Sequence, residues 1–334
     1  MISAGIVGIT GFTGLELIKI LLNHSAVSIE YLSSRSKTEN KISDVYPELN
    51  GIFEKEIEPI DIERISHLDV VFLALPHTVS LEIVKQIEGD VKIIDLSADF
   101  RLKDISVYEK WYKVEHKAKE LVNSAVYGLP ELNYDKIKTA KIVANPGCYA
   151  TSVILAVAPV AEYALDVVAD AKSGVSGAGR GLKEGLQFCE VNENFKAYSI
   201  EGHRHIPEIE QELSKFNKNI QVMFIPHLLP IQRGILSTVY ISVEKEMDFK
   251  AVYKDFYKDA PFVRVVDKPP TLNNVKGTNF CDIYVHFDER VKKLVVISVI
   301  DNLIKGASGQ AVQNMNIMFN LNQKEGLILK PYYP

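Results

Sequence analysis

The chain has 334 residues, of which 47% are hydrophobic and 24% charged, and its formal net charge is −5 at pH 7. This composition excludes collagen, coiled-coil and disordered chains, and it gives no electrostatic reason to expect nucleic acid or an acidic membrane as a partner. The sequence contains no apolar run long enough to span a bilayer and no basic leader before its first apolar run. We therefore expect a cytoplasmic protein, and the length suggests two domains or three.

The N-terminal half alternates between strand patterns and helix patterns, which is typical of βαβ units in a parallel sheet. The strand-like runs are almost continuously apolar, as expected when a sheet is covered on both faces. These runs occupy residues 2–7, 27–32, 69–75, 91–96 and 141–144, and helical segments lie at 13–23, 60–66 and 78–86.

The C-terminal half has a different pattern, in which apolar and polar residues alternate with a period of two. This alternation predicts strands with one solvated face, and hence an α+β domain with an antiparallel or mixed sheet. The pattern changes near residues 146–148, where we place the domain boundary. The strands are expected at 235–244, 282–287 and 292–300, and the helices at 206–215, 249–257 and 309–321.

A glycine-rich turn follows the first strand and opens the first helix. Glycines let a backbone approach a pyrophosphate, and a helix N-terminus offers free N–H groups and a positive dipole end. We predict a dinucleotide site here, although the spacing Gly-x-x-Gly-x-x-Gly is not the common one and a plain tight turn is the alternative. The predicted cofactor-binding residues of this turn are Gly8, Thr10, Gly11, Phe12, Thr13 and Gly14.

The end of the second predicted strand bears on the choice between NAD and NADP. Ser33, Ser34 and Arg35 stand there, with Arg35 21 residues after Gly14. Two hydroxyls and a guanidinium suit a 2′-phosphate, because Arg binds phosphate oxygens bidentately. Glu30 is the competing residue, and an acid at the strand end would favour NAD. Since Glu30 falls within the predicted strand, we favour NADP(H), and the alternative for Arg35 is a solvated loop charge.

Cys148 carries the strongest local signal among the three cysteines, which are too few for a disulfide framework. A buried strand ends before it, an Asn-Pro-Gly turn follows, and a helix is predicted to begin at the cysteine. A thiol at a helix N-terminus is activated as a nucleophile. The alternative is a small buried residue in a turn.

Several motifs together resemble the N-acetyl-γ-glutamyl-phosphate reductase family. Individual motifs are shared in part with aspartate-semialdehyde dehydrogenase, but the combination of HRHIPEI and PHLLP is typical of the glutamyl-phosphate enzymes. The resemblance runs in order from residue 5 to about residue 315. The motifs are GITGFTGLEL (8–17), DLSADFRL (95–102), VYGLPEL (126–132), NPGCYAT (145–151), SGAGR (176–180), GHRHIPEI (202–209), PHLLPIQRGIL (226–236) and DNLIKGASGQA (301–311).

The resemblance implies a fold, a reaction and two catalytic residues. The fold would combine a Rossmann-type NADP-binding domain, residues 1–147 and 308–334, with an α+β catalytic and dimerisation domain, residues 148–307, in a homodimer or homotetramer. The reaction would be NADPH-dependent reduction of N-acetyl-L-glutamyl 5-phosphate to the 5-semialdehyde and inorganic phosphate, in arginine biosynthesis. Cys148 would form a thioester, and His205, before Pro207 at a helix start, would be the general acid/base.

Further residues in matched motifs are predicted to bind the cofactor or the anionic substrate. No additional His or Cys cluster stands close to His203 and His205 in sequence, so we expect no metal, although an i, i+2 metal pair is the alternative reading. The predicted cofactor contacts are Pro76, Ser176, Gly177 and Asn302, and the predicted substrate contacts are Arg101, Arg180, His203 and Arg233.

Three other functions remain open at this stage. Aspartate-semialdehyde dehydrogenase performs the same chemistry on a shorter acyl phosphate, and a related reductase acts on a carrier-linked substrate of lysine synthesis. A non-catalytic NADP-binding regulator is the third, but it would need neither Cys148 nor His205.

Overall fold

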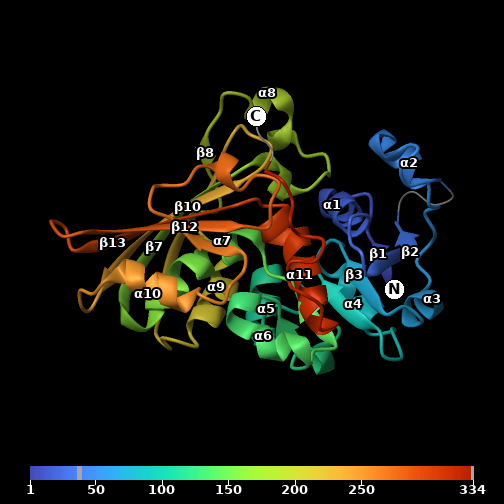
Figure 1. Cartoon of the computed structure of the whole chain (residues 1–334), viewed down its shortest axis with the longest axis horizontal. Helices are drawn as coiled ribbons and strands as arrows, with labels where there is room; N and C mark the ends of the chain where they lie inside the picture. The colour runs from blue at the N-terminus through green and yellow to red at the C-terminus, as the bar shows by residue number, and fades with distance from the viewer. Residues whose placement is uncertain (36–39, 332–334) are drawn as a thin grey trace. The chain divides into compact units, whose positions relative to one another are not determined.

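The computed structural model describes residues 1–35 and 40–331 and contains two compact units (Figure 1). The first unit comprises Met1–Pro146 and Ser308–Leu327, which come before and after Gly147–Ala307 of the second unit in the sequence. The predicted first domain extended to the end of the chain, whereas the described residues after Leu327 group with the second unit.

The first unit is built on a parallel sheet, as predicted. In the described residues, the sheet has six strands in the order β2-β1-β3-β4-β6-β5. Every neighbouring pair is parallel, and the strands are almost completely buried. The strands are β1 (Ile2–Val7), β2 (Val27–Ser33), β3 (Val70–Leu73), β4 (Lys92–Asp95), β5 (Ala125–Tyr127) and β6 (Ile142–Ala144).

Helices connect these strands and cover the sheet. They include α11, whose ten residues are all buried and which contacts α1, α6 and β4 (Figure 1). Asn314 of α11 donates to Gly128 O at 2.8 Å, and Asn316 bonds His24 at 2.9 Å. These bonds tie the returning segment into the unit. The helices of this unit are α1 (Phe12–Leu21), α2 (Ile42–Val45), α3 (Ile62–Ser66), α4 (Val79–Val84), α5 (Ile105–Tyr112), α6 (Pro130–Lys138) and α11 (Gly309–Met318).

The second unit contains a mixed sheet, which in the described residues has seven strands in the order β11-β12-β13-β10-β7-β9-β8. The central pairs are antiparallel, whereas β7–β9 and β11–β12 are parallel. The prediction of an antiparallel or mixed sheet is confirmed. The strands are β7 (Ala164–Ser173), β8 (Lys196–Ala197), β9 (Val222–Leu228), β10 (Ile235–Val243), β11 (Val263–Val265), β12 (Cys281–Asp288) and β13 (Lys293–Ile300).

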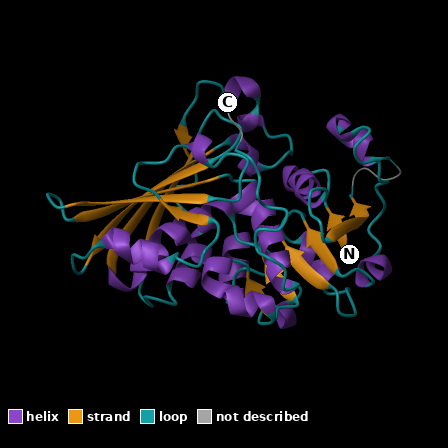
Figure 2. Cartoon of the chain, in the orientation of Figure 1, coloured by secondary structure: helices purple, strands orange, loops and turns teal. Residues whose placement is uncertain are grey.

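One face of this sheet is covered by helices, as Figure 2 shows. The helices are α7 (Cys148–Val157), α9 (Ile206–Leu213) and α10 (Phe249–Phe256), and α7 contacts β10 and β13. In β10 the residues Ile235, Val239 and Ile241 are buried, while Tyr240 between them is exposed. The period of two predicted for this strand therefore reflects one covered and one open face.

Candidate active site

Cys148 is the first residue of α7, four residues after the end of β6. Its side chain is partly exposed, whereas the other nine residues of α7 are buried. The positive end of the helix dipole favours an anion at this position. Cys281 is buried in β12, and Cys189 is exposed in the short helix α8 (Phe188–Val191). Of the three thiols, only Cys148 combines partial exposure with the first position of a buried helix.

His205 lies against the residue that precedes this cysteine. A Cβ built on Gly147 would lie only 2.7 Å from Cε1 of His205, so the missing side chain of Gly147 makes room for the imidazole. His205 is the N-cap of α9, and Pro207 stands in its first turn. Because proline fixes φ near the helical value, it holds the start of this helix rigidly.

Glu208, in the same turn of α9, also contacts Gly147. Its Oε1 accepts a hydrogen bond from the backbone N–H of Gly147 at 2.8 Å, and the residue is only 1% exposed. The contact with Gly147 depends on tertiary packing, so no local sequence signal could have revealed it.

His203 is held as a neutral imidazole. Burial, together with the positive charge of Arg204, lowers the pKa of His203 from 6.5 to about 4. Its Nδ1 accepts the backbone N–H of His205 at 3.1 Å, so the proton of the neutral ring is on Nε2. The ring lies edge-on to Tyr149 and His205, with centroid distances of 5.7 and 4.7 Å. His203 therefore offers an uncharged N–H donor beside His205.

Two tyrosines that sequence reasoning did not select complete the wall of this site. The Tyr198 hydroxyl donates to the Tyr149 hydroxyl at 3.4 Å, and Tyr149 donates to the backbone carbonyl of His227 at 3.0 Å. Burial raises the pKa of Tyr149 and of Tyr198, so both remain protonated at neutral pH. The position of Tyr149 directly after Cys148 is the one signal that the sequence offered.

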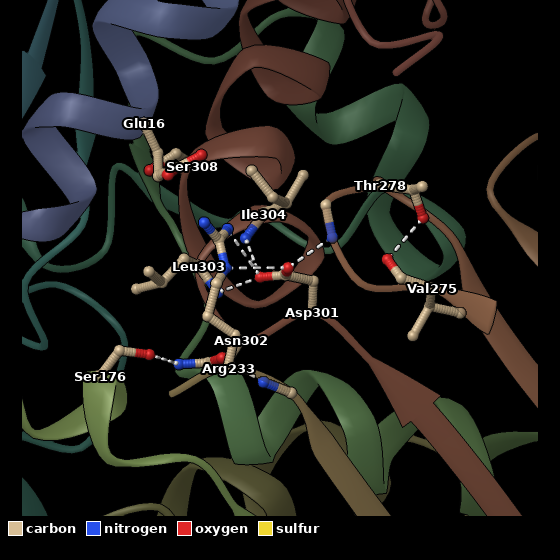
Figure 3. A network of polar contacts seen from close by, with 12 residues as sticks. Glu16, Ser176, Arg233, Val275, Thr278, Asp301, Asn302, Leu303, Ile304 and Ser308 are labelled. Carbon is tan, nitrogen blue, oxygen red and sulfur yellow. Dashed lines mark hydrogen bonds and ion pairs between the residues drawn. The ribbon is translucent and has the colours of Figure 1, made fainter. Parts of the chain in front are cut away.

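The side chain of Arg233 pairs with Asp301 (Figure 3). Its Nε and Nη2 donate to the two carboxylate oxygens, both at 3.1 Å. Asp301 is fully buried and also accepts the backbone N–H groups of Gly277, Leu303 and Ile304. This carboxylate thus joins three separate segments of the second unit, and a substrate role for Arg233 stays a prediction.

The residues that follow Asp301 lie against the cysteine. The segment Ile304–Ser308 forms a π-helical turn, and a Cβ built on Gly306 would lie 2.7 Å from Cβ of Cys148. Asn302, predicted to bind the cofactor, donates to Oγ of Ser176 at 2.9 Å and accepts the N–H of Gly234 at 2.7 Å (Figure 3). Asn302 is 2% exposed, and its amide links the segments that contain Ser176 and Gly234.

The other predicted substrate and cofactor contacts fall in different settings. Arg101, in the first unit, is 5% exposed and donates to the carbonyls of Asn145 and Leu96 at 2.8 and 2.9 Å. Arg180 and Gly177 are exposed at and beyond the short turn Val175–Ala178. The substrate roles of Arg101 and Arg180 and the cofactor role of Gly177 stay predictions.

The glycine turn between β1 and α1 has the close packing that a dinucleotide site requires. Gly8 has φ +95°, and a Cβ on Gly14 would lie 2.6 Å from Cα of Ile9. Gly11 is the N-cap of α1 and has no side chain to occupy the helix end. The first N–H groups of α1 therefore point outward, as a pyrophosphate site needs.

The residues predicted to face the 2′-phosphate lie at the end of β2. Ser33 is its last residue, and Oγ of Ser34 is 3.5 Å from Oγ1 of Thr10 in the glycine turn. Arg35 is exposed, and Glu30 is an exposed residue within the strand, 3.8 Å from Lys55. Pro76 is exposed after β3. Ser33 and Ser34 are buried, so Arg35 is the exposed residue of the three at the strand end, where the group that distinguishes NADP from NAD belongs.

Comparisons with known proteins decide the family. Residues 3–140 match the family model "Semialdehyde dehydrogenase, NAD binding domain", and residues 148–302 match "Semialdehyde dehydrogenase, dimerisation domain". N-acetyl-gamma-glutamyl-phosphate reductases of Thermoanaerobacter sp. and Desulfotalea psychrophila are 48% and 47% identical, over 100% of both chains in each case. The chain belongs to the N-acetyl-gamma-glutamyl-phosphate reductase family. The predicted family and the predicted class, an oxidoreductase of amino-acid biosynthesis, are confirmed.

Solved structures support the fold of this reductase family member. Aspartate semialdehyde dehydrogenase II of Vibrio cholerae, solved with ASA, matches with a TM-score of 0.69, covering 96% of this chain and 98% of that chain at 16% identity. Aspartate semialdehyde dehydrogenase of Candida albicans, solved with NADP, matches with a TM-score of 0.72, covering 96% of this chain and 98% of that chain at 15% identity. At these identities the likeness concerns the fold, and the relatives above favour the glutamyl-phosphate reductase over the aspartate enzyme.

No group of three or more His, Cys, Asp or Glu residues in the described part of the chain could hold a metal ion. No described helix is both long and apolar enough to cross a bilayer.

Proposed function

We propose that this chain reduces N-acetyl-L-glutamyl 5-phosphate to N-acetyl-L-glutamate 5-semialdehyde and inorganic phosphate, with NADPH as the reductant, in arginine biosynthesis. The observation that carries this proposal is the placement of Cys148 at the start of α7, with the ring of His205 packed against Gly147. A thiol and an imidazole on adjacent helix starts are the parts that acyl transfer through a thioester needs.

The chain's own residues form and release the covalent intermediate. His205 takes the thiol proton of Cys148, and the resulting thiolate attacks the acyl carbon. The bond from that carbon to the phosphate oxygen breaks, phosphate leaves, and a thioester remains. NADPH, when bound, supplies the hydride that reduces this acyl group. The carbonyl then re-forms and the bond from carbon to sulfur breaks, which releases the aldehyde. His205 returns the proton to the Cys148 sulfur.

Basic and neutral donors would bind the two anionic ends of the substrate. We place the first substrate contact on Arg180, which is exposed, and keep Arg101 and Arg233 as further proposed contacts. His203 donates a neutral N–H beside His205. The substrate's phosphate and carboxylate both accept such bonds.

The glycine turn, with Ser33, Ser34 and Arg35, would hold NADPH. We also assign cofactor contacts to Pro76, Ser176, Gly177 and Asn302. The cytoplasm is the proposed location, because the mechanism needs Cys148 reduced, and that compartment keeps thiols reduced. The described structure has all three cysteines as free thiols.

One assay tests the reaction. The purified chain receives NADP, inorganic phosphate and either N-acetylglutamate semialdehyde or aspartate semialdehyde, and NADPH formation is followed by absorbance. We expect phosphate-dependent turnover with the N-acetylglutamate compound and none with Cys148→Ser. Preferred turnover of aspartate semialdehyde would contradict the substrate, and full activity of Cys148→Ser would contradict the thioester.

We also propose that a second copy of the chain covers the open face of the seven-stranded sheet. Met223, Val168, Tyr240 and Val295 form one row across β9, β7, β10 and β13, and Met223 and Tyr240 are 62% and 40% exposed. Such apolar rows facing water mark interaction surfaces. The family model over this unit is that of a dimerisation domain, which favours a second copy as the partner.

Sedimentation tests this interface. Tyr240→Lys should shift the chain from dimer to monomer because a charge would be buried between the two sheets. Ile52→Lys is the matched control, because Ile52 is 70% exposed in the other unit. A dimer that survives Tyr240→Lys unchanged would place the interface elsewhere.

A further inference from the structure

The first turn of α9 contacts Gly147 at two points. His205 fills the space where a side chain of Gly147 would lie, and Oε1 of Glu208 accepts the Gly147 N–H at 2.8 Å. His205 and Glu208 are three residues apart, so they share one face of the helix. One rigid helix start therefore supplies both the imidazole and the carboxylate.

Both backbone polar groups of Gly147 are fixed by this arrangement. The N–H is bound by Glu208, and the carbonyl accepts the N–H of Thr151 at 2.8 Å and its hydroxyl at 3.1 Å. Cys148 follows directly and therefore has little freedom to move relative to α9. Glu208 is 1% exposed, and burying a carboxylate is costly unless it is hydrogen-bonded.

We propose that Glu208 is a positioning residue that holds the Cys148 sulfur within reach of His205 by binding the N–H of Gly147. Glu208 itself touches neither substrate nor sulfur in this role. It acts through the peptide unit before the nucleophile, so its removal lets the turn shift away from the imidazole. The inference rests on the proposed function only in taking Cys148 as the nucleophile.

Glu212 provides a matched control. It lies one turn further along α9, is also 1% exposed, and pairs with Lys215. Replacing it removes a buried carboxylate from the same helix without touching the Gly147 turn. A general loss of helix stability would therefore affect both residues, whereas loss of positioning would affect Glu208 alone.

The experiment compares Glu208→Ala, Glu208→Gln and Glu212→Ala in the full-length enzyme. For each we would measure kcat, KM and the rate at which iodoacetamide labels Cys148, with the exposed Cys189 as the internal reference. A hydrogen bond to a charged group corresponds to about 10- to 100-fold in rate. We expect Glu208→Ala to lose kcat by that factor, with KM within about 3-fold and an altered labelling ratio.

Glu208→Gln keeps an acceptor oxygen at the same reach, so we expect it to retain kcat within about 5-fold of wild type. Glu212→Ala should lower the melting temperature while leaving kcat and the labelling ratio unchanged. Normal kcat in Glu208→Ala, equal loss in Glu212→Ala, or a Gln variant as defective as the Ala variant would overturn the proposal.

If Glu208→Ala does not fold, Glu208→Asp takes its place. The shorter side chain keeps the charge but does not reach the N–H, so its kcat should fall well below that of Glu208→Gln. Equal activity of the Asp and Gln variants would overturn the proposal. The labelling ratio needs no substrate, so it tests the positioning even if the wild-type enzyme fails to use N-acetylglutamyl phosphate.

Discussion

Two strand–turn–helix junctions carry the proposed chemistry, and their glycines pack against different kinds of neighbour. Between β1 and α1, Gly8 and Gly14 lie against backbone, with a Cβ on Gly14 only 2.6 Å from Cα of Ile9. Between β6 and α7, Gly147 lies against the His205 side chain, and Glu208 takes its N–H. The first junction leaves its helix start open to a ligand, whereas the second is occupied by the side chains of His205 and Glu208.

The two junctions should therefore respond differently to amino-acid substitution. The glycine turn packs on the backbone of neighbouring strands, because a Cβ on Gly8 would meet Ala74 and the N–H groups of Gly8 and Ile9 bond the carbonyl of Ser33. The cysteine turn depends on α9, about sixty residues further along the chain. A substitution at the second junction should therefore disturb catalysis before it disturbs cofactor binding.

The largest effect is expected for Gly147→Ala. The added methyl group would meet the His205 ring, with Cε1 at 2.7 Å, and moving the imidazole should reduce kcat by about 10²-fold or more. Gly185→Ala is the control, because its Cβ would have nothing closer than 3.7 Å and the residue has no proposed role. Steady-state kinetics with NADPH binding measured separately would show whether the loss is catalytic. Unchanged kcat in Gly147→Ala would mean that His205 does not act from this position.

Replacing each histidine in turn with asparagine should distinguish the general acid/base, His205, from the substrate-binding residue, His203. His205→Asn should lower kcat about 10²-fold, in line with loss of a general acid/base. His203→Asn should act mainly on KM, because His203 is neutral and serves as an N–H donor. Steady-state kinetics with rapid-mixing observation of the thioester step would check both. A larger kcat loss in His203→Asn would reverse the assignment.

At the first junction, Arg35→Asp should change cofactor preference. Loss of a charge-assisted bond to the 2′-phosphate corresponds to about 1.5–3 kcal/mol, so the preference for NADPH over NADH should fall about 10- to 100-fold. Lys55→Ala is a useful control, because Lys55 lies near the rival residue Glu30. The ratio of kcat/KM for the two cofactors is the measurement, and an unchanged ratio would move the 2′-phosphate site elsewhere.

The two junctions also differ in how far sequence could predict them. The glycine turn, the parallel sheet and the start of α7 at Cys148 follow from local patterns, and the structure has each where it was expected. In the second unit the sequence predicted β10, β12 and β13 but missed β7, β8, β9 and β11, although β7 alternates. Long-range partners were out of reach of local patterns. The bond from Glu208 to Gly147 and the pairing of Arg233 with Asp301 join residues 61 and 68 positions apart.

His227 illustrates the same limit. Its place in the PHLLP motif makes it the next candidate for the acid/base after His205, but its neighbours cannot be read from sequence. The structure has it on β9 with its ring nitrogen 3.1 Å from Asp170, while Phe224 of the same strand contacts His203. An odd separation of three residues along a strand puts the two side chains on opposite faces of the sheet. His227 therefore lies away from the His203 ring.

Stability should also depend on pH, with opposite signs in the two units. The pKa of His203 falls from 6.5 to about 4 on folding, so the unfolded chain binds more protons between these values. Stability from this group is complete above pH 6.5 and is lost as the pH falls towards 4, by at most about 3 kcal/mol. Urea unfolding at pH 7 and pH 4 should therefore show a smaller acid loss in His203→Gln than in wild type.

Asp95, in the first unit, should act in the opposite direction. Burial and the neighbouring charge of Asp99 raise its pKa from 3.8 to about 6, so the folded chain binds the extra proton. The stability that Asp95 contributes to the folded state is complete below pH 3.8 and is lost as the pH rises through 6. Asp95→Asn should enlarge the measured acid loss, and a variant with the wild-type pH profile would contradict this account.

The most direct test of the central claim is the covalent intermediate on Cys148. The enzyme would be mixed with N-acetylglutamyl phosphate in the absence of NADPH, quenched in acid and analysed by peptide mass spectrometry alongside released phosphate. The account predicts an acyl group on the peptide containing Cys148, with one phosphate released per acylated chain and neither product in Cys148→Ser. Phosphate release without an adduct, or an adduct on Cys189 or Cys281 instead, would contradict it.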